Sequence, residues 1–135
     1  MIVTITYPLP PTMNEMIGLL NRNRFAYSST KKKWKQKIIE LSKDLPRFEG
    51  KVWIHAVYTV NTRANDPDNV RSALKFILDG LTPPTGKEPD RHWVIKSDNM
   101  TIIQSPIIEE FIIGKDKQVT ITISDKPLYK IEVLH

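Results

Sequence analysis

Residues 65–81, NDPDNVRSALKFILDGL, combine a helix start, an amphipathic helix and two aspartates separated by one residue. Apolar residues recur in this segment at the spacing of a helix with one buried face, which predicts a helix from about Pro67 to Gly80. Asp66 is a favourable N-cap, proline is preferred at the first helical position, and Asp68 complements the helix dipole. Gly80, near the expected end, suits a left-handed residue. Capping alone explains both aspartates, so a metal site needs support from elsewhere in the chain.

Segments with strand character lie on both sides of this helix. Residues 2–7 are β-branched and alternate, and residues 51–60 place an apolar side chain at every even position. Two further strands are expected at roughly 99–113 and 117–124, and residues 128–134 are a candidate for a short last strand.

A second helix is predicted between the first two strands. Residues 28–30, SST, offer N-caps, and the helix is expected to run to about Lys43. Its core-facing stripe has spacings of four, three and four residues and consists of Trp34, Ile38, Leu41 and Leu45. The lysines of this helix should therefore point outward.

Three stretches are expected to be loops. Residues 8–15 are proline-rich and read as extended, and residues 18–28 carry glycine, asparagine and arginine. Residues 82–97 contain three prolines, a glycine and mixed charge, and an exposed loop of that length in a small domain is often functional. We expect a single α+β domain over residues 1–135, with a mixed β-sheet packed against two principal helices.

The composition excludes several classes of protein. The chain has no cysteine, which rules out a disulfide scaffold, a thiolate zinc site and a cysteine nucleophile. Residues 1–20 lack the basic start and long apolar core of a signal peptide, and the apolar runs are too short to span a bilayer. We therefore expect a cytoplasmic protein with no membrane partner.

The positive charge is concentrated in one region. The formal net charge is +5 and the isoelectric point is near 9.5. No acid occurs from residue 16 to 39, where the basic residues are Arg22, Arg24, Lys31, Lys32, Lys33, Lys35 and Lys37. Such a run favours a polyanionic partner. The alternative is a solvated lysine face that maintains solubility.

A metal site at the two aspartates would need a further ligand from another part of the chain. A hard cation binds several carboxylate oxygens and leaves its remaining positions to water and phosphate. Asp98 follows the long loop and precedes an apolar segment, and Glu88 and Asp90 compete with it. Carboxylates around Mg²⁺ on a basic protein suggest phosphodiester hydrolysis, because the ion can neutralise the scissile phosphate and activate water. No glycine-rich phosphate loop, paired-histidine zinc motif or Ser/His/Asp spacing offers a rival.

Three segments together resemble a known family. Residues 8–14, PLPPTMN, are similar to a Pro-x-Pro-Pro-Ser-x-Asn segment, residues 66–69, DPDN, to an Asp-x-Asp-Asn core, and residues 97–102, SDNMTI, to an Asp-Asp-x-x-Val/Ile strand entry. These are the motifs, in the same order, of the RusA-type Holliday junction resolvases, small endonucleases common in phages and prophages.

The resemblance implies a function and a set of site residues. It implies a homodimer that binds four-way DNA junctions during recombination and repair and makes paired, symmetry-related nicks. The magnesium ion would be held by Asp66, Asp68 and Asp98, and Asn69 would orient a ligand or contact DNA.

The chain departs from the family at the catalytic lysine. The family places this lysine four residues after the second aspartate, where this sequence has Ser72. If Asp79-Gly80-Leu81 is aligned with the family's Asp-Ala-Leu, Lys75 takes the lysine's place across a three-residue insertion. Residues seven apart on a helix lie about 20° from eclipsed, so Lys75 would share the face of Asp68. Arg71 and Lys96 are substitutes, and a solvated helix lysine is the alternative interpretation of Lys75.

The expected function is thus a magnesium-dependent, structure-specific endodeoxyribonuclease that resolves four-way junctions. Arg22, Arg24 and the lysines of residues 31–37 would contact backbone phosphates, a contact that weakens steeply with salt. Two other functions remain open. A metal-dependent nuclease for other branched DNA would keep the carboxylates, whereas a non-catalytic DNA-binding module would use the basic face alone and leave the aspartates as caps.

Overall fold

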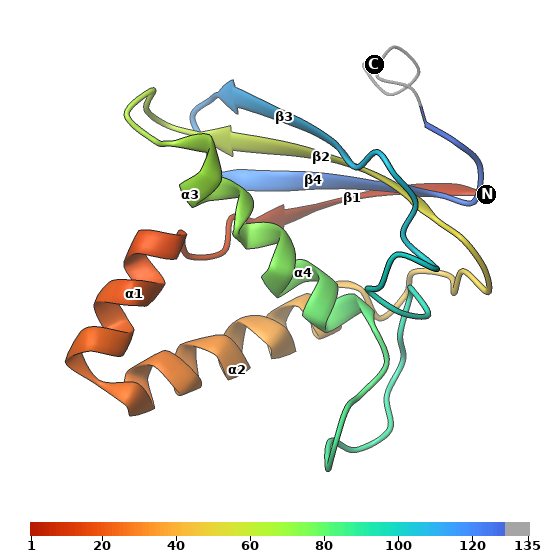
Figure 1. The fold of residues 1–135 in the computed structure, drawn as a ribbon, viewed down its shortest axis with the longest axis horizontal. Coiled ribbons are helices and arrows are strands. Elements are labelled where there is room, and N and C mark those ends of the chain that lie inside the picture. The colour runs from red at the N-terminus through yellow and green to blue at the C-terminus, as the bar shows by residue number, and fades with distance from the viewer. Residues whose placement is uncertain (129–135) are drawn as a thin grey trace.

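Four strands form one mixed sheet, and the helices pack beside it (Figure 1). The structure is a computed structural model that describes residues 1–128. The strands are β1 (Ile2–Pro8), β2 (Trp53–Val60), β3 (Ile108–Ile113) and β4 (Gln118–Ser124). Their order in the sheet is β1-β4-β2-β3, in which β4 pairs antiparallel with β1 and β2, and β2 pairs parallel with β3. The fold is α+β with a mixed sheet, as predicted.

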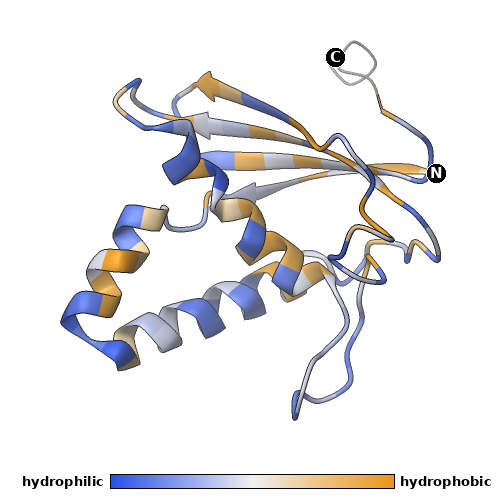
Figure 2. Cartoon of the chain, viewed as in Figure 1, coloured by the Kyte–Doolittle hydropathy of each residue, from blue (hydrophilic) through white to orange (hydrophobic). Residues whose placement is uncertain are grey.

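Strand β2 supplies the centre of the core. The even positions from Val52 to Val60 are all buried, which confirms the face predicted from their alternation. They join the buried side chains of the other strands and of the helices in one cluster, which also includes Ile77 and Leu81. Figure 2 shows these strands as mainly apolar or intermediate in hydropathy, in contrast to the more hydrophilic helix of residues 24–41.

The predicted helix after β2 is two helices, α3 (Pro67–Arg71) and α4 (Ala73–Leu81). They meet at Ser72, whose Oγ donates a hydrogen bond of 3.0 Å to the carbonyl oxygen of Asn69. A serine hydroxyl that bonds to the preceding turn competes with the regular helical ladder, which accounts for the break. The two helices form the crossover between the parallel strands β2 and β3 (Figure 1).

The prediction of a loop at residues 18–28 is wrong. These residues belong to α1 (Met13–Arg22) and to the start of α2 (Arg24–Leu41). Thr12 Oγ1 accepts from the backbone N–H of Glu15 at 3.3 Å, and Glu15 Oε1 accepts from the N–H of Thr12 at 3.2 Å, so a capping box begins α1 inside the proline-rich stretch. Asn23 then caps α2 through its side-chain oxygen.

Helix α2 packs against α4 through a glycine. A Cβ atom at Gly80 would lie 2.5 Å from Ile38 Cγ2, so Gly80 permits a close approach of the two helices. Gly86 is the only described glycine with a positive φ, so Gly80 does not adopt a left-handed conformation. The suggested capping role of Gly80 is therefore wrong. Ile38 is fully buried, as its place in the predicted stripe requires, whereas Leu41 is exposed.

The segment between α4 and β3 is irregular. The third strand begins at residue 108 rather than near 99, because residues 99–103 form a turn. Asn99 stabilises this turn: its side-chain oxygen accepts from the N–H of Thr101 at 3.1 Å, and its carbonyl accepts from the N–H of Ile103 at 2.9 Å. The candidate strand at residues 128–134 lies outside the described residues except for Leu128. Within residues 1–128, none of the helices is long and apolar enough to cross a bilayer.

Candidate functional site

The two aspartates of the DPDN segment lie at the start of α3. Asp66 is the N-cap, and its Oδ1 accepts from the backbone N–H of Asp68 at 3.0 Å, which confirms the capping interpretation. Pro67 occupies the first turn of α3, as expected. The Asp68 carboxylate is 74% exposed and lies 3.2 Å from Nη1 of Arg71. The pair therefore presents an open acidic surface with one cation beside it.

Arg71 is held on several sides. Its Nε lies 3.5 Å from Glu109 Oε1, and its guanidinium lies 5.8 Å from the centre of the Phe111 ring. Glu109 in turn accepts a hydrogen bond of 2.8 Å from the hydroxyl of Tyr58, which is fully buried. Burial raises the pKa of Tyr58 far above its ordinary value, and the adjacent Glu109 raises it further. This chain of contacts connects the core to the exposed Asp68.

Sequence reasoning missed Glu109 and Phe111. Both lie on β3, and the parallel register sets Phe111 opposite Tyr58, with the two rings stacked at 4.9 Å between centroids. The sequence carries no local signal for this arrangement, because the register of β2 with β3 decides which residues of β3 face α3.

Asn69 connects the first two motif segments. Its Oδ1 accepts a hydrogen bond of 2.7 Å from the backbone N–H of Asn14, which belongs to the PLPPTMN segment at the start of α1. The N-terminus of α1 is therefore fastened to α3 directly beside the Asp66–Asp68 pair.

Lys75, on α4, contacts the third motif segment through Asp98. Its Nζ lies 2.8 Å from Asp79 Oδ1 and 3.6 Å from Asp98 Oδ2. The hydrogen bond to Asp79, with further support from Asp98, raises the pKa of Lys75 above its ordinary value, so Lys75 is a cation at neutral pH. Among the described residues, Lys75 forms ion pairs with Asp79 and Asp98 and none with Asp68, which pairs with Arg71.

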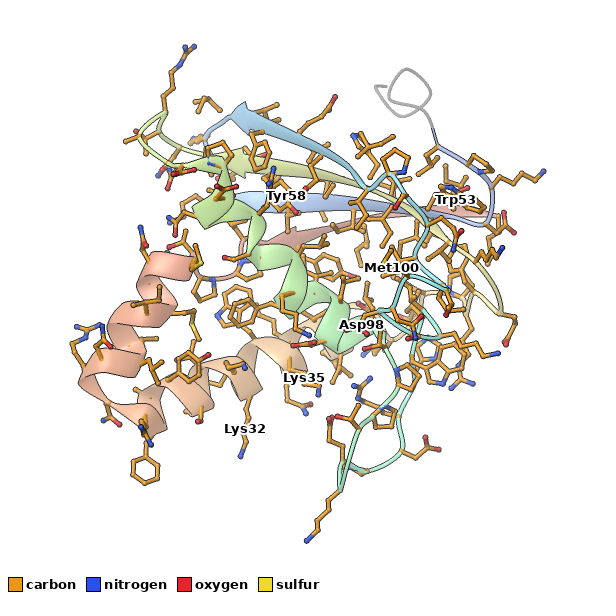
Figure 3. The ribbon with its side chains drawn as sticks, viewed as in Figure 1. Lys32, Lys35, Trp53, Tyr58, Asp98 and Met100 are labelled. Atoms are coloured by element: carbon orange, nitrogen blue, oxygen red, sulfur yellow. The ribbon has the colours of Figure 1, made fainter. Side chains whose placement is uncertain are left out.

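Asp98 does not lie with the other two aspartates of the expected set. Figure 3 shows Asp98 beside α4, whereas Asp66 and Asp68 lie in α3 and its cap. Within residues 1–128, no three His, Asp or Glu side chains lie close enough together to hold a metal ion. The three-aspartate cluster is thus not assembled in the described structure, and the role of Asp98 as a ligand stays a prediction.

The Asp66–Asp68 pair supplies two carboxylates for Mg²⁺, and within residues 1–128 it lacks the third acidic ligand that the sequence analysis expected. In proteins this ion commonly takes one or two carboxylates and completes its octahedron with water and substrate phosphates. The open Asp68 carboxylate leaves room for such ligands. Arg71 is also placed to contact a phosphate that approaches the pair.

Most of the basic residues predicted to contact DNA are on the surface of α1 and α2. The exposed ones are Arg22, Arg24, Lys31, Lys32, Lys33 and Lys37. Lys35 differs, because its Nζ forms an ion pair of 2.6 Å with Glu88 of the long loop. Figure 3 shows Lys32 pointing away from the body of the molecule.

A polar cavity of about 380 Å³ lies between α2, α4 and the segment after α4. Three lysines line it, namely Lys35, Lys75 and Lys96, together with Asp79 and Asp98. Lys96, one of the substitutes for the catalytic lysine, therefore lies near Lys75 rather than at the Asp66–Asp68 pair. The sequence matches no protein-family model and no curated protein.

Proposed function

We propose that this protein is a magnesium-dependent endodeoxyribonuclease that acts on branched DNA, with four-way junctions as its principal substrate. The proposal joins the resemblance of three sequence segments to RusA-type resolvases with the arrangement of these segments in the fold. The observation that carries it is the hydrogen bond between Asn14 and Asn69, because it fastens the first motif segment to the second beside two open carboxylates.

The contact between Lys75 and Asp98 supports the same proposal. It joins the third motif segment to the helix pair that carries the second. Segments that are distant in the sequence thus meet the helix pair at two places, Asn14 at α3 and Asp98 at α4, and the proposal assigns both contacts to one extended site. Capping explains Asp66 and Asp68, but it does not explain why the other two segments meet these helices.

In this proposal Asp66 and Asp68 hold the metal ion. When bound, Mg²⁺ would neutralise the scissile phosphate and lower the pKa of an attacking water. Arg71 hydrogen-bonds a phosphate oxygen of the DNA, and Glu109 and Phe111 keep its guanidinium in place. Lys75 supplies a second positive charge, and Asp79 and Asp98 position its ammonium group.

The exposed basic face of α1 and α2 would bind the DNA backbone. Contacts from lysine and arginine to phosphates do not depend on the DNA sequence, so this binding should be sequence-independent and should weaken as the salt concentration rises. The preference for four-way junctions would come from a homodimer whose two sites match the symmetry of the junction. The dimer and the junction preference rest on the family resemblance.

The direct test uses the purified protein and a synthetic mobile four-way junction. We expect paired, symmetric nicks in the presence of Mg²⁺ and none in EDTA, with linear duplex of the same sequence cut far more slowly. Equal cutting of flaps or nicked duplexes would favour a nuclease for other branched DNA. Binding without any magnesium-dependent product would favour a non-catalytic DNA-binding module.

A further inference from the structure

A second cavity, of about 210 Å³, opens between α1, α2 and α4. The residues that line it are Met13, Met16, Tyr27, Lys31, Ser72, Lys75, Phe76 and Asp79. Cavities for drug-sized ligands measure roughly 300–1,000 Å³, so this one suits a single small ring system. Met16 is buried, whereas Tyr27 and Phe76 are half-buried and line the cavity.

The chemistry of the lining fits a planar group that carries a negative charge at one end. Tyr27 and Phe76 offer aromatic surfaces for stacking, and the methionine side chains are polarizable and adapt to a flat ligand. Lys31 supplies positive charge, and its Nζ lies 5.4 Å from the centre of the Tyr27 ring, whereas the Lys75 ammonium is paired with Asp79, which also lines the cavity. A nucleotide has this combination of a flat base and an anionic phosphate.

The position of the cavity relates it to the proposed nuclease site. Ser72, which lines the cavity, is also the break between α3 and α4, four residues beyond Asp68 in the chain. Lys31 belongs to the exposed basic face of α2. A DNA strand that contacts both the α2 lysines and α3 would therefore pass the mouth of this cavity.

We propose that the cavity takes one unpaired nucleobase of the bound DNA, stacked against Tyr27 and Phe76, while Lys31 contacts the adjacent phosphate. The inference rests on the proposed function. Bases at a branch point are unstacked at lower cost than bases within a duplex, which would help the protein distinguish junctions from linear DNA. Every base has a flat face, so stacking of this kind tolerates different sequences.

The test measures the affinity of the protein for four-way junctions in EDTA, where no cleavage is expected. Junctions with a single abasic site at each nucleotide flanking the crossover are compared with the intact junction, first with the wild-type protein. We expect one position at which loss of the base weakens binding on the order of tenfold. If no position does so, the inference is overturned without any protein variant.

The same junctions are then measured with Tyr27→Ala and with a matched control, Phe25→Ala. Phe25 lies on the same helix, is 87% exposed and does not line the cavity. Tyr27→Ala should weaken binding of the intact junction, and removal of the base should then weaken its binding little further. Phe25→Ala and Tyr27→Phe should retain the wild-type difference in affinity between the intact and the abasic junction. Additive effects of Tyr27→Ala and the abasic site would overturn the inference.

Failure of the proposed function would be recognised separately. If the loss of the base and Tyr27→Ala have non-additive effects on junction binding, but the wild-type protein never nicks junctions with Mg²⁺, the nuclease proposal is wrong and the base-binding cavity is supported. A wild-type protein that binds no branched DNA would overturn both.

Discussion

The backbone N–H of Asn14 donates a hydrogen bond of 2.7 Å to the side-chain oxygen of Asn69, although 55 residues separate the two in the sequence. This bond fastens the start of α1 to α3, and α1 in turn leads directly into the basic helix α2. The position of the basic face relative to Asp66 and Asp68 therefore depends in part on one asparagine side chain.

Asn69→Ala should reduce the free energy of unfolding by about 0.5–1.5 kcal/mol, because it removes the acceptor of this hydrogen bond. Urea unfolding followed by circular dichroism measures the difference. Asn61→Ala is the matched control, since Asn61 is exposed just after β2. Equal stability of the two variants would show that the bond contributes nothing to the fold.

Alanine at two glycines should change stability in opposite directions. At Gly80 the added Cβ would lie 2.5 Å from Ile38 Cγ2, and the forced separation of α2 from α4 should cost about 1–3 kcal/mol. At Gly18, inside α1, the added Cβ meets no atom within 4 Å, and the helix should gain roughly 0.5–1 kcal/mol. Thermal unfolding of both variants tests the pair, and a stabilised Gly80→Ala would refute the close packing of α2 on α4.

The ion pair between Lys35 and Glu88 should make stability depend on pH in the acid range. Lys35 lowers the pKa of Glu88 from its ordinary 4.5 to about 2. Because the folded state holds the lower pKa, the stabilisation is fully present above pH 4.5 and disappears as the pH falls towards 2. Partly exposed pairs are screened by solvent, so the effect should be on the order of 0.5–1 kcal/mol.

Glu88→Gln should remove this dependence. Its stability relative to wild type should be lower at pH 6 and should approach the wild-type value near pH 2, as measured by chemical unfolding across that range. Glu49→Gln, at an exposed glutamate preceding β2, serves as the control. The same loss in both variants would mean that the contact to Lys35 is not the cause.

Asp98→Asn should slow magnesium-dependent nicking on the order of tenfold, because Asp98 contacts Lys75 rather than the Asp66–Asp68 pair. A residue that positions the lysine should matter less than a metal ligand. Single-turnover nicking of the junction gives the rate. A loss as complete as that of Asp68→Asn would instead establish the three-aspartate set that the resemblance implies.

Periodicity and caps predicted the parts of the fold that depend on local patterns. The alternation along β2 identified its buried face, and Asp66 was recognised as the cap of α3. The capping box of Thr12 and Glu15 was also present in the sequence, but the adjacent prolines suggested an extended loop. The break at Ser72 depends on a side-chain hydrogen bond that competes with the helix, which periodicity does not register.

The arrangement around the candidate site depends on contacts that no local pattern specifies. Glu109 reaches Arg71 because of the parallel register between β2 and β3. Asp98 reaches Lys75 because of the path of the irregular segment after α4. The sequence therefore does not specify which of the candidate residues meet in the fold.

The most direct test of the nuclease account compares Asp68→Asn with wild type on the same four-way junction. With Mg²⁺ present, the substitution should reduce the nicking rate by at least a hundredfold, because it removes a carboxylate that the proposal assigns to the ion, while junction affinity in EDTA stays within a few-fold of wild type. Asp44→Asn, at an exposed position after α2, should keep full activity. Undiminished nicking by Asp68→Asn would contradict the central claim.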